Sequence, residues 1–331
     1  MSEAERRDDR ITRRKFLKRA AKSGLSIAAA GSLAYWLHDA VGPSAARAAK
    51  TTIALPDGSI PSLGSRMAVV EGKNRAESLK RGLDALGGID AFVQRGDLVV
   101  VKVNAAFASP PMLGATTHPE LVGEMVRLCL RAGAAEVRVV DNPINDPASC
   151  FRLTGIGDAT EQAGGKLIMP RQDFFKSFTL AGGELIRNWP VLATPLDGAN
   201  KIIGLAPLKD HLRAGASMTM KNWYGLLGGR RNIFHQDIHN TVKELAMMVR
   251  PTLVVLDATV AMMTNGPTGG SLLDLKETNT LIVSTDQVAA DALGCELLGK
   301  AIADLPYIAK AAEAGVGTAD YKSLNPIRIA A

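Results

Sequence analysis

The sequence predicts an α/β fold with a mostly parallel sheet that helices cover on both faces. Short runs of apolar and β-branched residues alternate along the chain with segments of helical periodicity. Two of these runs, Leu98–Val103 and Leu253–Leu256, are apolar almost throughout, which is typical of parallel strands buried on both faces. Strands and helices that alternate with short connections predict a parallel sheet between two helical layers. A division into two lobes, with a boundary near residue 205, stays open.

Each expected element is marked by the residues that begin and end it. Residues 67–70 form an apolar strand, and Asn74 is placed to cap a helix that ends at Gly87. Residues 117–120, Thr-His-Pro-Glu, have the pattern of a capping box with proline in the first turn, and the helix that they open ends at Gly133. The first half of the chain therefore alternates strands and helices from residue 67 onward.

The alternation continues into the second half of the chain. The remaining expected elements are strands at residues 137–140, 165–169, 253–256 and 281–283 and helices at residues 238–249 and 286–298. Residues 174–208 combine short β-like runs with turn residues and give no clear period. We therefore expect one α/β domain over residues 67–300, with an irregular segment at 49–66 before it and a tail at 301–331 that packs on it.

The first 48 residues have the pattern of a twin-arginine export signal. Arg13 and Arg14 precede an apolar run at residues 24–37, and Ala46-Arg47-Ala48 has the small residues of a cleavage site. The run has 14 residues, fewer than the about 20 that cross a bilayer. We therefore expect a periplasmic protein that the twin-arginine export machinery carries and that is cleaved near Ala48. An uncleaved membrane anchor and a basic amphipathic helix on a membrane surface are the alternatives.

Composition and charge exclude a nucleic-acid partner. The chain has 331 residues and a formal net charge of +6, but its first 48 residues carry ten Lys and Arg and five Asp and Glu. The remainder therefore has 29 basic and 28 acidic residues, and so small a net charge gives no support to nucleic-acid binding. Aromatic residues make up only 5% of the chain, so base-stacking platforms are not expected either.

The three cysteines exclude a metal centre built from thiolates alone. Cys129, Cys150 and Cys295 are far apart and form no Cys-x-x-Cys pair, so no iron–sulfur cluster is expected from this chain. Cys129 and Cys295 fall in apolar helical patterns and are expected in the core. A disulfide through Cys150 stays open, because the expected compartment is oxidising.

Polar residues follow the expected strands at their carboxyl ends, where α/β sheets bind ligands. Lys102 and Asn104 close one strand, and Asp141, Asp257 and Asp286 follow three others. A lysine in an apolar run needs a partner, so Lys102 is expected to face a ligand or a carboxylate. Asp286 has an alternative role as a helix cap, and Asp141 has one in a turn. We expect all five side chains to take part in ligand binding.

The segment at residues 209–239 is the densest in side chains that carry chemistry. It holds three of the four histidines that follow residue 48. Its candidate residues are Lys209, His211, Lys221, Asn222, His235 and His239. Glycines between residues 225 and 229 let backbone amides approach a ligand, and the lysines and arginines supply countercharge for a phosphate or carboxylate. A surface loop with solvated arginines is the alternative. The segment matches neither a P-loop nor the zinc-protease or serine-hydrolase motifs.

Two further patterns concern a metal and the rim of the site. His235 and His239 are four residues apart, so on a helix both project from one face, as two imidazoles that share a metal must. They are the candidate ligands of a divalent metal, and a pair of surface histidines is the alternative. Residues 265–270, Asn-Gly-Pro-Thr-Gly-Gly, form a turn that we expect at the rim of the pocket.

The order of these motifs resembles the family known as domain of unknown function 362, over residues 67–299. The motifs that carry the resemblance are Gly96-Asp97, Lys102-x-Asn104, Thr117-x-Pro119, Asp141, Lys209-x-His211, Lys221-Asn222-x-x-Gly225, His235, Asp257, Gly266-Pro267-x-Gly269 and Ser284-Thr285-Asp286-x-x-Ala289-x-Asp291. The resemblance implies no settled reaction. Many members carry a ferredoxin-like module with cysteine clusters, which this chain lacks, so electron transfer would need a separate redox partner.

Two functions fit these observations. The first is an exported enzyme that binds a small anionic molecule, with Lys102, Lys209 and Lys221 as countercharges. His211 or His235 then acts as the acid–base group or metal ligand, and the aspartates orient it or bind metal. Lys221 is a candidate catalytic residue together with these two histidines. The alternative is a non-catalytic accessory protein that binds a ligand or cofactor for a periplasmic redox system. The substrate and the identity of any cofactor are not readable from the sequence.

Overall fold

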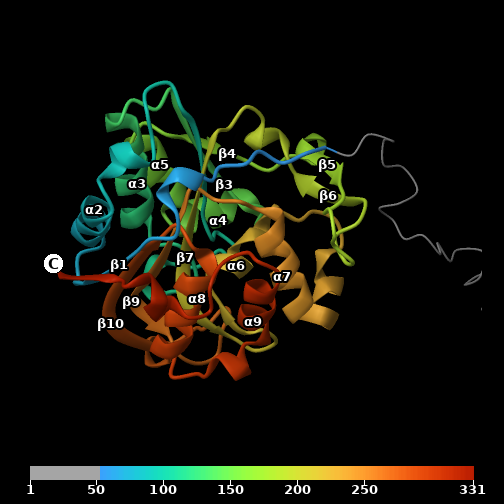
Figure 1. Cartoon of the computed structure of the whole chain (residues 1–331). Coiled ribbons are helices and arrows are strands. Elements are labelled where there is room, and N and C mark those ends of the chain that lie inside the picture. Colours follow the sequence, from blue (N-terminus) through green and yellow to red (C-terminus); the bar gives the residue numbers. More distant parts are fainter. Residues whose placement is uncertain (1–52) are drawn as a thin grey trace, which may run out of the picture. The chain divides into compact units, whose positions relative to one another are not determined.

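The structure is a computed structural model that describes residues 53–331, and the expected export signal at residues 1–48 lies outside the described residues. A mixed sheet runs through the centre of the described part (Figure 1). Its nine strands are β1 (Met67–Glu71), β2 (Leu98–Lys102), β3 (Glu136–Val140), β4 (Lys166–Ile168), β7 (Lys201–His211), β8 (Gly215–Ser217), β9 (Leu253–Met262), β10 (Leu275–Ser284) and β11 (Ile327–Ala330). The order across the sheet is β11-β1-β10-β9-β7-β2-β3-β4, and β8 pairs with the end of β7.

Most neighbouring strands of this sheet run in the same direction. The pairs β11–β1, β9–β7, β7–β2, β2–β3 and β3–β4 are parallel. β10 is antiparallel to both of its neighbours, β9 and β1. The α/β fold with a mostly parallel sheet, as predicted from the alternation of strands and helices, is therefore confirmed.

β9 and β10 are longer than predicted and form a hairpin. Each has ten residues, because the strands continue through polar positions such as Asp257 and Thr280 that interrupt the apolar pattern. Residues 263–274 join them and contain a short turn of 3₁₀ helix, η8 (Leu272–Asp274), but no crossover helix. A parallel connection needs a longer crossover, usually with a helix, so β10 returns antiparallel. The end of β10 at Ser284 therefore lies beside the start of β9, where it pairs with Val254.

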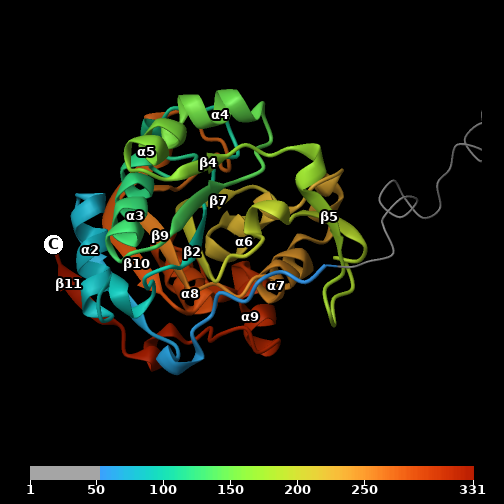
Figure 2. The same cartoon turned by 90° about the horizontal axis from the view of Figure 1, so that it is seen from above.

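Helices cover both faces of the sheet (Figure 2). One layer contains α2 (Arg75–Ala85), α3 (Pro119–Arg131), α4 (Pro147–Leu153) and α5 (Ile156–Gln162), and the other contains α6 (Thr219–Asn222), α7 (Ile238–Met248), α8 (Gln287–Leu297) and α9 (Pro306–Glu313). Alternate residues of β2 enter the two cores. Val99 and Val101 pack in the cluster that contains Leu121 of α3, and Val100 packs in the cluster that contains Val242 of α7.

One helix begins at its predicted capping residue, and the cap of another is shifted by one residue. The Asn74 side chain accepts a hydrogen bond of 2.8 Å from the Glu77 amide, and α2 begins there as expected. α3 is capped by His118, whose Nδ1 accepts from the Glu120 amide at 3.3 Å, and not by Thr117. The Thr117 hydroxyl is used elsewhere, because it donates to a backbone carbonyl of β7 and accepts an amide hydrogen of the segment after β2.

The remaining expectations concern the middle of the chain, its end and its cysteines. Residue 205 lies inside β7 at the centre of the sheet, so no lobe boundary falls there. The irregular region that precedes it contains a separate antiparallel pair, β5 (Phe175–Phe178) and β6 (Trp189–Leu192). At the other end, β11 joins the C-terminal segment to the sheet. Cys150 is buried in α4 as a free thiol, so the disulfide left open is not formed.

No helix within residues 53–331 combines the length and apolar character that a membrane crossing requires.

Candidate functional site

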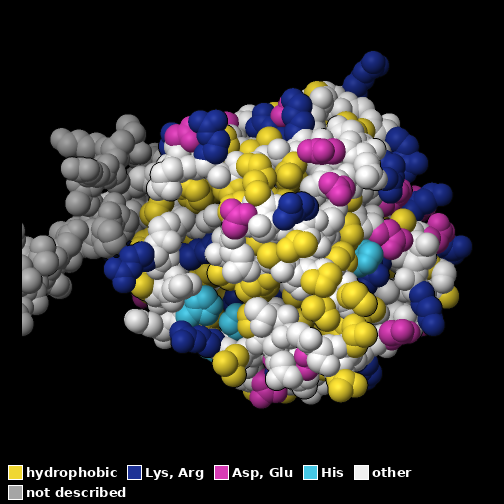
Figure 3. All heavy atoms as spheres, turned by 180° about the vertical axis from the view of Figure 1, so that it is seen from behind, with side chains coloured by type: hydrophobic (Ala, Val, Ile, Leu, Met, Phe, Trp, Pro, Cys, Tyr) yellow, Lys and Arg dark blue, Asp and Glu magenta, His cyan; other side chains and the backbone are white. Residues whose placement is uncertain are grey.

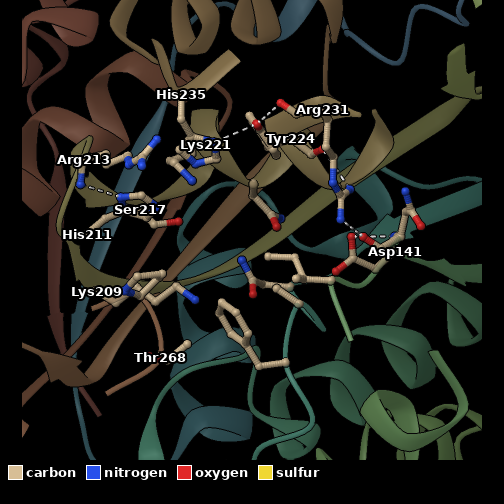
Figure 4. A pocket seen from close by; sticks show the side chains of 18 of the residues that line it. Asp141, Lys209, His211, Arg213, Ser217, Lys221, Tyr224, Arg231, His235 and Thr268 are labelled. Atoms are coloured by element: carbon tan, nitrogen blue, oxygen red, sulfur yellow. Dashed lines mark hydrogen bonds between the residues drawn. The ribbon is translucent and has the colours of Figure 1, made fainter. Parts of the chain in front are cut away.

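A cavity of about 430 Å³ lies at the carboxyl ends of β2, β3 and β7 (Figure 4). This is the edge at which open α/β sheets bind ligands. Eight of the predicted site residues line it: Lys102, Asn104, Asp141, Lys209, His211, Lys221, Asn222 and His235. Pro267 and Thr268, from the turn predicted at the rim, line it as well. The described chain thus brings together residues that are more than 130 positions apart in sequence.

The floor of the cavity is a buried ion pair between two neighbouring strands. Lys102 is the last residue of β2 and Asp141 follows β3, and their Nζ and Oδ1 atoms are 2.8 Å apart. The Asp141 carboxylate also accepts the Asn142 amide at 2.9 Å and the Ala105 amide at 2.6 Å. Burial lowers the pKa of Lys102, and the nearby Asp141 partly opposes that effect. Both charges are satisfied within the protein, so this pair shapes the floor and leaves little charge for a ligand.

Gly225 lies directly on this ion pair. A Cβ atom at this position would come within 1.9 Å of the Asp141 carboxylate and 2.7 Å of the Lys102 ammonium. The absence of a side chain lets the backbone approach so closely, and the Gly225 carbonyl accepts the Asn142 amide at 3.1 Å. This glycine of the predicted Lys-Asn-x-x-Gly motif is therefore required by packing.

The short helix α6 carries two site residues to the cavity. Asn222 joins it to the sheet, because its amide nitrogen donates to the carbonyls of Lys102 and Leu205, each at 3.1 Å. The carboxylate of Asp291, on α8, accepts the Thr219 amide at 2.8 Å and the Met220 amide at 3.1 Å at the start of α6. The backbone that presents Lys221 is thus fixed from both sides.

Lys209 and Lys221 face the cavity without a carboxylate partner among residues 53–331 (Figure 4). Their side chains are 1% and 8% exposed. The Lys209 ammonium donates to the Ala115 carbonyl and lies 5.2 Å from the centroid of the Phe107 ring. The Lys221 ammonium lies 5.0 Å from the centroid of the Tyr224 ring. Burial lowers the pKa of each lysine to about 7, and nearby positive charges add to the effect, which the charge of Asp141 partly opposes at Lys209.

The hydrogen bonds of His211 fix its tautomer. Its Nδ1 accepts the backbone amides of Arg213 and Ala214, each at 3.2 Å, so the ring hydrogen of the neutral form is on Nε2. Burial is the main cause that lowers the pKa of His211, to about 2, and the Lys221 charge is the second. His211 is therefore a neutral hydrogen-bond donor at physiological pH.

His235 is held in the opposite tautomer. The Tyr224 hydroxyl donates its single hydrogen to the Arg231 carbonyl, so toward the His235 Nδ1, 3.0 Å away, the hydroxyl oxygen accepts. The ring hydrogen of His235 is then on Nδ1, and Nε2 keeps its lone pair. Burial, followed by the Lys221 charge, lowers the pKa of His235 to about 4. His235 is therefore a neutral acceptor beside a neutral donor.

Three predicted residues lie outside the cavity. Asp257 is in the middle of β9 rather than at its end, and its carboxylate pairs with the Arg75 guanidinium at 2.7 Å. Asp286 follows β10, whose antiparallel direction carries it to the opposite edge of the sheet, and its side chain caps α8 through the Val288 and Ala289 amides. Neither side chain lines the cavity, and the capping alternative holds for Asp286.

The third residue outside the cavity is His239, the proposed partner of His235 in a metal site. His235 lies in η7 (Arg231–Asp237), a 3₁₀ helix, whereas His239 is in the first turn of α7. Their rings have different neighbours: that of His235 lies beside Tyr224, and that of His239 stacks on Tyr307 at 6.0 Å between centroids. No group of three His, Cys, Asp or Glu side chains in the described chain could hold a metal ion. His235 and His239 therefore do not provide the set of donor atoms that a divalent cation needs.

Tyr224 and Arg231 complete the site, and the list of candidates from sequence lacks both. Tyr224 orients His235, and Arg231 donates to the Asn142 carbonyl at 2.7 Å and the Leu227 carbonyl at 3.1 Å. The signal that the sequence offers for Tyr224 is its position directly before Gly225, the glycine of the Lys-Asn-x-x-Gly motif. Of the side chains around the cavity, five are Lys or Arg and one is a carboxylate.

Comparisons with known proteins give one family and one relative. The model of a family described as domain of unknown function 362 matches residues 99–296. A thylakoid-associated protein of Synechocystis sp. is 26% identical over 245 residues, which are 70% of this chain and 72% of that protein.

Two solved structures match part of this chain. They are the lactate racemase apoprotein from Thermoanaerobacterium thermosaccharolyticum, with a TM-score of 0.40, and a protein from Thermotoga maritima, with a TM-score of 0.36. Each is 14% identical and covers 74% of this chain. This chain spans 61% and 60% of their respective lengths.

Proposed function

The chain belongs to the family of the domain of unknown function 362, and on that premise we propose that its cavity binds a small anion and that the protein is an enzyme that transfers a proton there. The anion is a carboxylate or a phosphate. Lys209 and Lys221 hold it, His235 acts as the base, and His211 donates a hydrogen bond to the reacting group.

The observation that carries the proposal is the unpaired charge of the two lysines. A buried ammonium group without a counterion loses hydration that the protein must replace, which costs several kcal/mol. Lys102 recovers this through Asp141 at 2.8 Å, but no carboxylate among residues 53–331 pairs directly with Lys209 or Lys221, and the charge of Asp141 offsets the burial of Lys209 only in part. An anion in the cavity would supply the missing countercharge for both. Perturbed lysines in a cavity are typical of functional sites.

The two histidines support proton transfer because their hydrogen bonds give them different roles. A base needs a free lone pair, which the tautomer of His235 provides at Nε2. A neutral imidazole N–H, which His211 provides at Nε2, stabilises negative charge that develops on an oxygen atom. When a proton moves from the bound molecule to His235, the electron pair left behind is stabilised by His211 and by the ammonium group of Lys221.

The test is a binding titration followed by a search for turnover. We expect the purified full-length protein to bind acetate or inorganic phosphate, and Lys221→Met to weaken that binding at least tenfold without loss of folding. Lys201→Met is the matched control, because Lys201 starts the same strand that carries Lys209 but lies 3.9 Å from the Asp97 carboxylate. Equal binding by the wild type and Lys221→Met contradicts the proposal. Binding with no proton exchange that depends on His235 favours the accessory role over the enzyme.

We also propose that the site works outside the cytoplasm after twin-arginine export. The support is the sequence pattern Arg13-Arg14 before an apolar run and an Ala-x-Ala site. Replacement of both arginines by lysine is expected to retain the protein in the cytoplasm on cell fractionation, whereas export of the double variant would contradict this proposal.

A further inference from the structure

The cavity changes in character from its floor to its mouth. At its floor are buried polar groups, among them Lys209 and Lys221, which are 1% and 8% exposed. Leu212 and Ile144, by contrast, line the same cavity with 87% and 60% of their surface exposed to water. The exposed part of the lining also contains the polar side chains of Arg213, Asn232 and Thr268, so Leu212 and Ile144 add apolar surface to a mixed mouth.

The backbone at each of these two residues is fixed by a hydrogen bond. The Leu212 amide, in the turn between β7 and β8, donates to the Gly266 carbonyl at 3.2 Å. The Ile144 amide, in the connection between β3 and α4, donates to the Ala106 carbonyl at 2.9 Å. Phe107, which packs against the Lys209 ammonium, lines the wall as well. Apolar contacts therefore accompany the cationic ones within one cavity.

Exposed apolar side chains are common on this molecule, as Figure 3 shows for one face, and single ones need no explanation. The position of Leu212 and Ile144 is different, because they line the same cavity as the two lysines. Water that contacts their side chains would be released when an apolar group covers them, and this release stabilises the complex in proportion to the area covered.

We propose that the ligand is amphipathic: its anionic group binds Lys209 and Lys221, and an apolar chain lies along the wall toward Leu212 and Ile144. This inference rests on the proposed function and adds the chemical class of the ligand. A small inorganic anion would leave Leu212 and Ile144 uncovered, whereas an acid with an alkyl or aryl substituent contacts both the lysines and these apolar side chains.

Two homologous series of ligands test the inference. The dissociation constants of the straight-chain carboxylates from acetate to octanoate, and of the matching n-alkyl phosphates, are measured by NMR titration with the full-length protein. We expect the affinity to rise about two- to fourfold per methylene in the preferred series, until the chain passes the mouth. Leu212→Ser combined with Ile144→Ser is expected to flatten the series without weakening acetate or methyl phosphate.

Leu273→Ser is the matched control, since Leu273 is 94% exposed but does not line the cavity, and it is expected to leave the slope unchanged. Equal affinities along both series, in a protein that still binds acetate or phosphate through Lys221, overturn this inference and leave the proposed function standing. A slope that Leu273→Ser reduces as much as the cavity variants do also overturns it. Binding of no member of either series overturns the proposed function itself.

Discussion

The imidazole rings of His211 and His235 stack with their centroids 5.7 Å apart and their planes 11° from parallel. His211 is the last residue of β7 and His235 lies in the 3₁₀ helix η7, so the fold, not the local sequence, brings the two rings together. Their hydrogen bonds leave a donor on one ring and an acceptor on the other. One ring of the pair can donate a hydrogen bond and the other can accept one. Such a pair suits a ligand group that gains or loses a proton during a reaction.

The tautomers themselves are the first prediction. Long-range ¹H–¹⁵N NMR spectra are expected to show His211 protonated at Nε2 and His235 at Nδ1, both neutral between pH 5 and pH 8, because their pKa values are about 2 and about 4. Tyr224→Phe removes the acceptor of the His235 Nδ1–H, so His235 should shift toward the Nε2 tautomer while His211 stays unchanged. A charged His235 at pH 7 would contradict this assignment.

The second prediction concerns stability and pH. Burial lowers the pKa of Lys221 from 10.5 to about 7, so between these values the unfolded chain binds more protons than the folded one. Stability contributed at this site therefore rises with pH, and the cost of the buried charge is largest below pH 7. Lys221→Met removes that cost, and we expect it to raise the melting temperature more at pH 6 than at pH 9. An equal gain at both pH values would show that Lys221 is not desolvated in the folded protein.

The third prediction concerns the glycine above the ion pair. Gly225→Ala places a methyl group 1.9 Å from the Asp141 carboxylate, and relief of this clash must displace the Asp141 and Lys102 side chains from their ion pair or shift the backbone at Gly225. We expect a loss of about 1–3 kcal/mol in the free energy of unfolding, measured by urea denaturation, together with weaker anion binding.

The matched control is Gly123→Ala inside α3, where the nearest atom to the new methyl is the end of the Arg127 side chain at 3.4 Å. Alanine in a helix interior is favoured over glycine by about 1 kcal/mol, so this variant should be neutral or more stable. A Gly225→Ala protein as stable as Gly123→Ala would refute the packing role of Gly225.

The fourth prediction separates Asp257 from the site. Its carboxylate pairs with Arg75 at 2.7 Å, and the two side chains are 5% and 13% exposed. Asp257→Ala leaves the guanidinium without a partner, and we expect it to lower the free energy of unfolding by about 3 kcal/mol. Because Asp257 does not line the cavity, anion affinity in the folded fraction should be unchanged. A selective loss of anion affinity at wild-type stability would return Asp257 to the binding site.

The parts of the site that the sequence predicts are those that follow from strand direction. Lys102 interrupts an apolar run, and its carboxylate partner Asp141 ends the next expected strand, so the parallel arrangement itself places them together. Lys209, Lys221 and His235 were identifiable because reactive side chains and glycines are dense in one segment.

The parts that the sequence does not predict depend on strand length and on tertiary neighbours. Asp257 reads as the end of a strand because the apolar run stops there, yet pairing with β10 extends β9 to Met262. Asp286 follows a strand whose antiparallel direction has no signature in an apolar run of three residues. Tyr224 has no signal in the sequence beyond its place before Gly225, and its role is defined by the Arg231 carbonyl and the His235 ring.

The most direct test of the account is to measure the pKa values of Lys209 and Lys221 by NMR of their side chains, in the free protein and with saturating acetate or phosphate. We expect both values near 7 in the free protein and a rise of at least one unit with the anion, because a bound negative charge favours the ammonium form. Values near 10.5 that the anion does not change would contradict the claim that these lysines are the countercharges of a ligand.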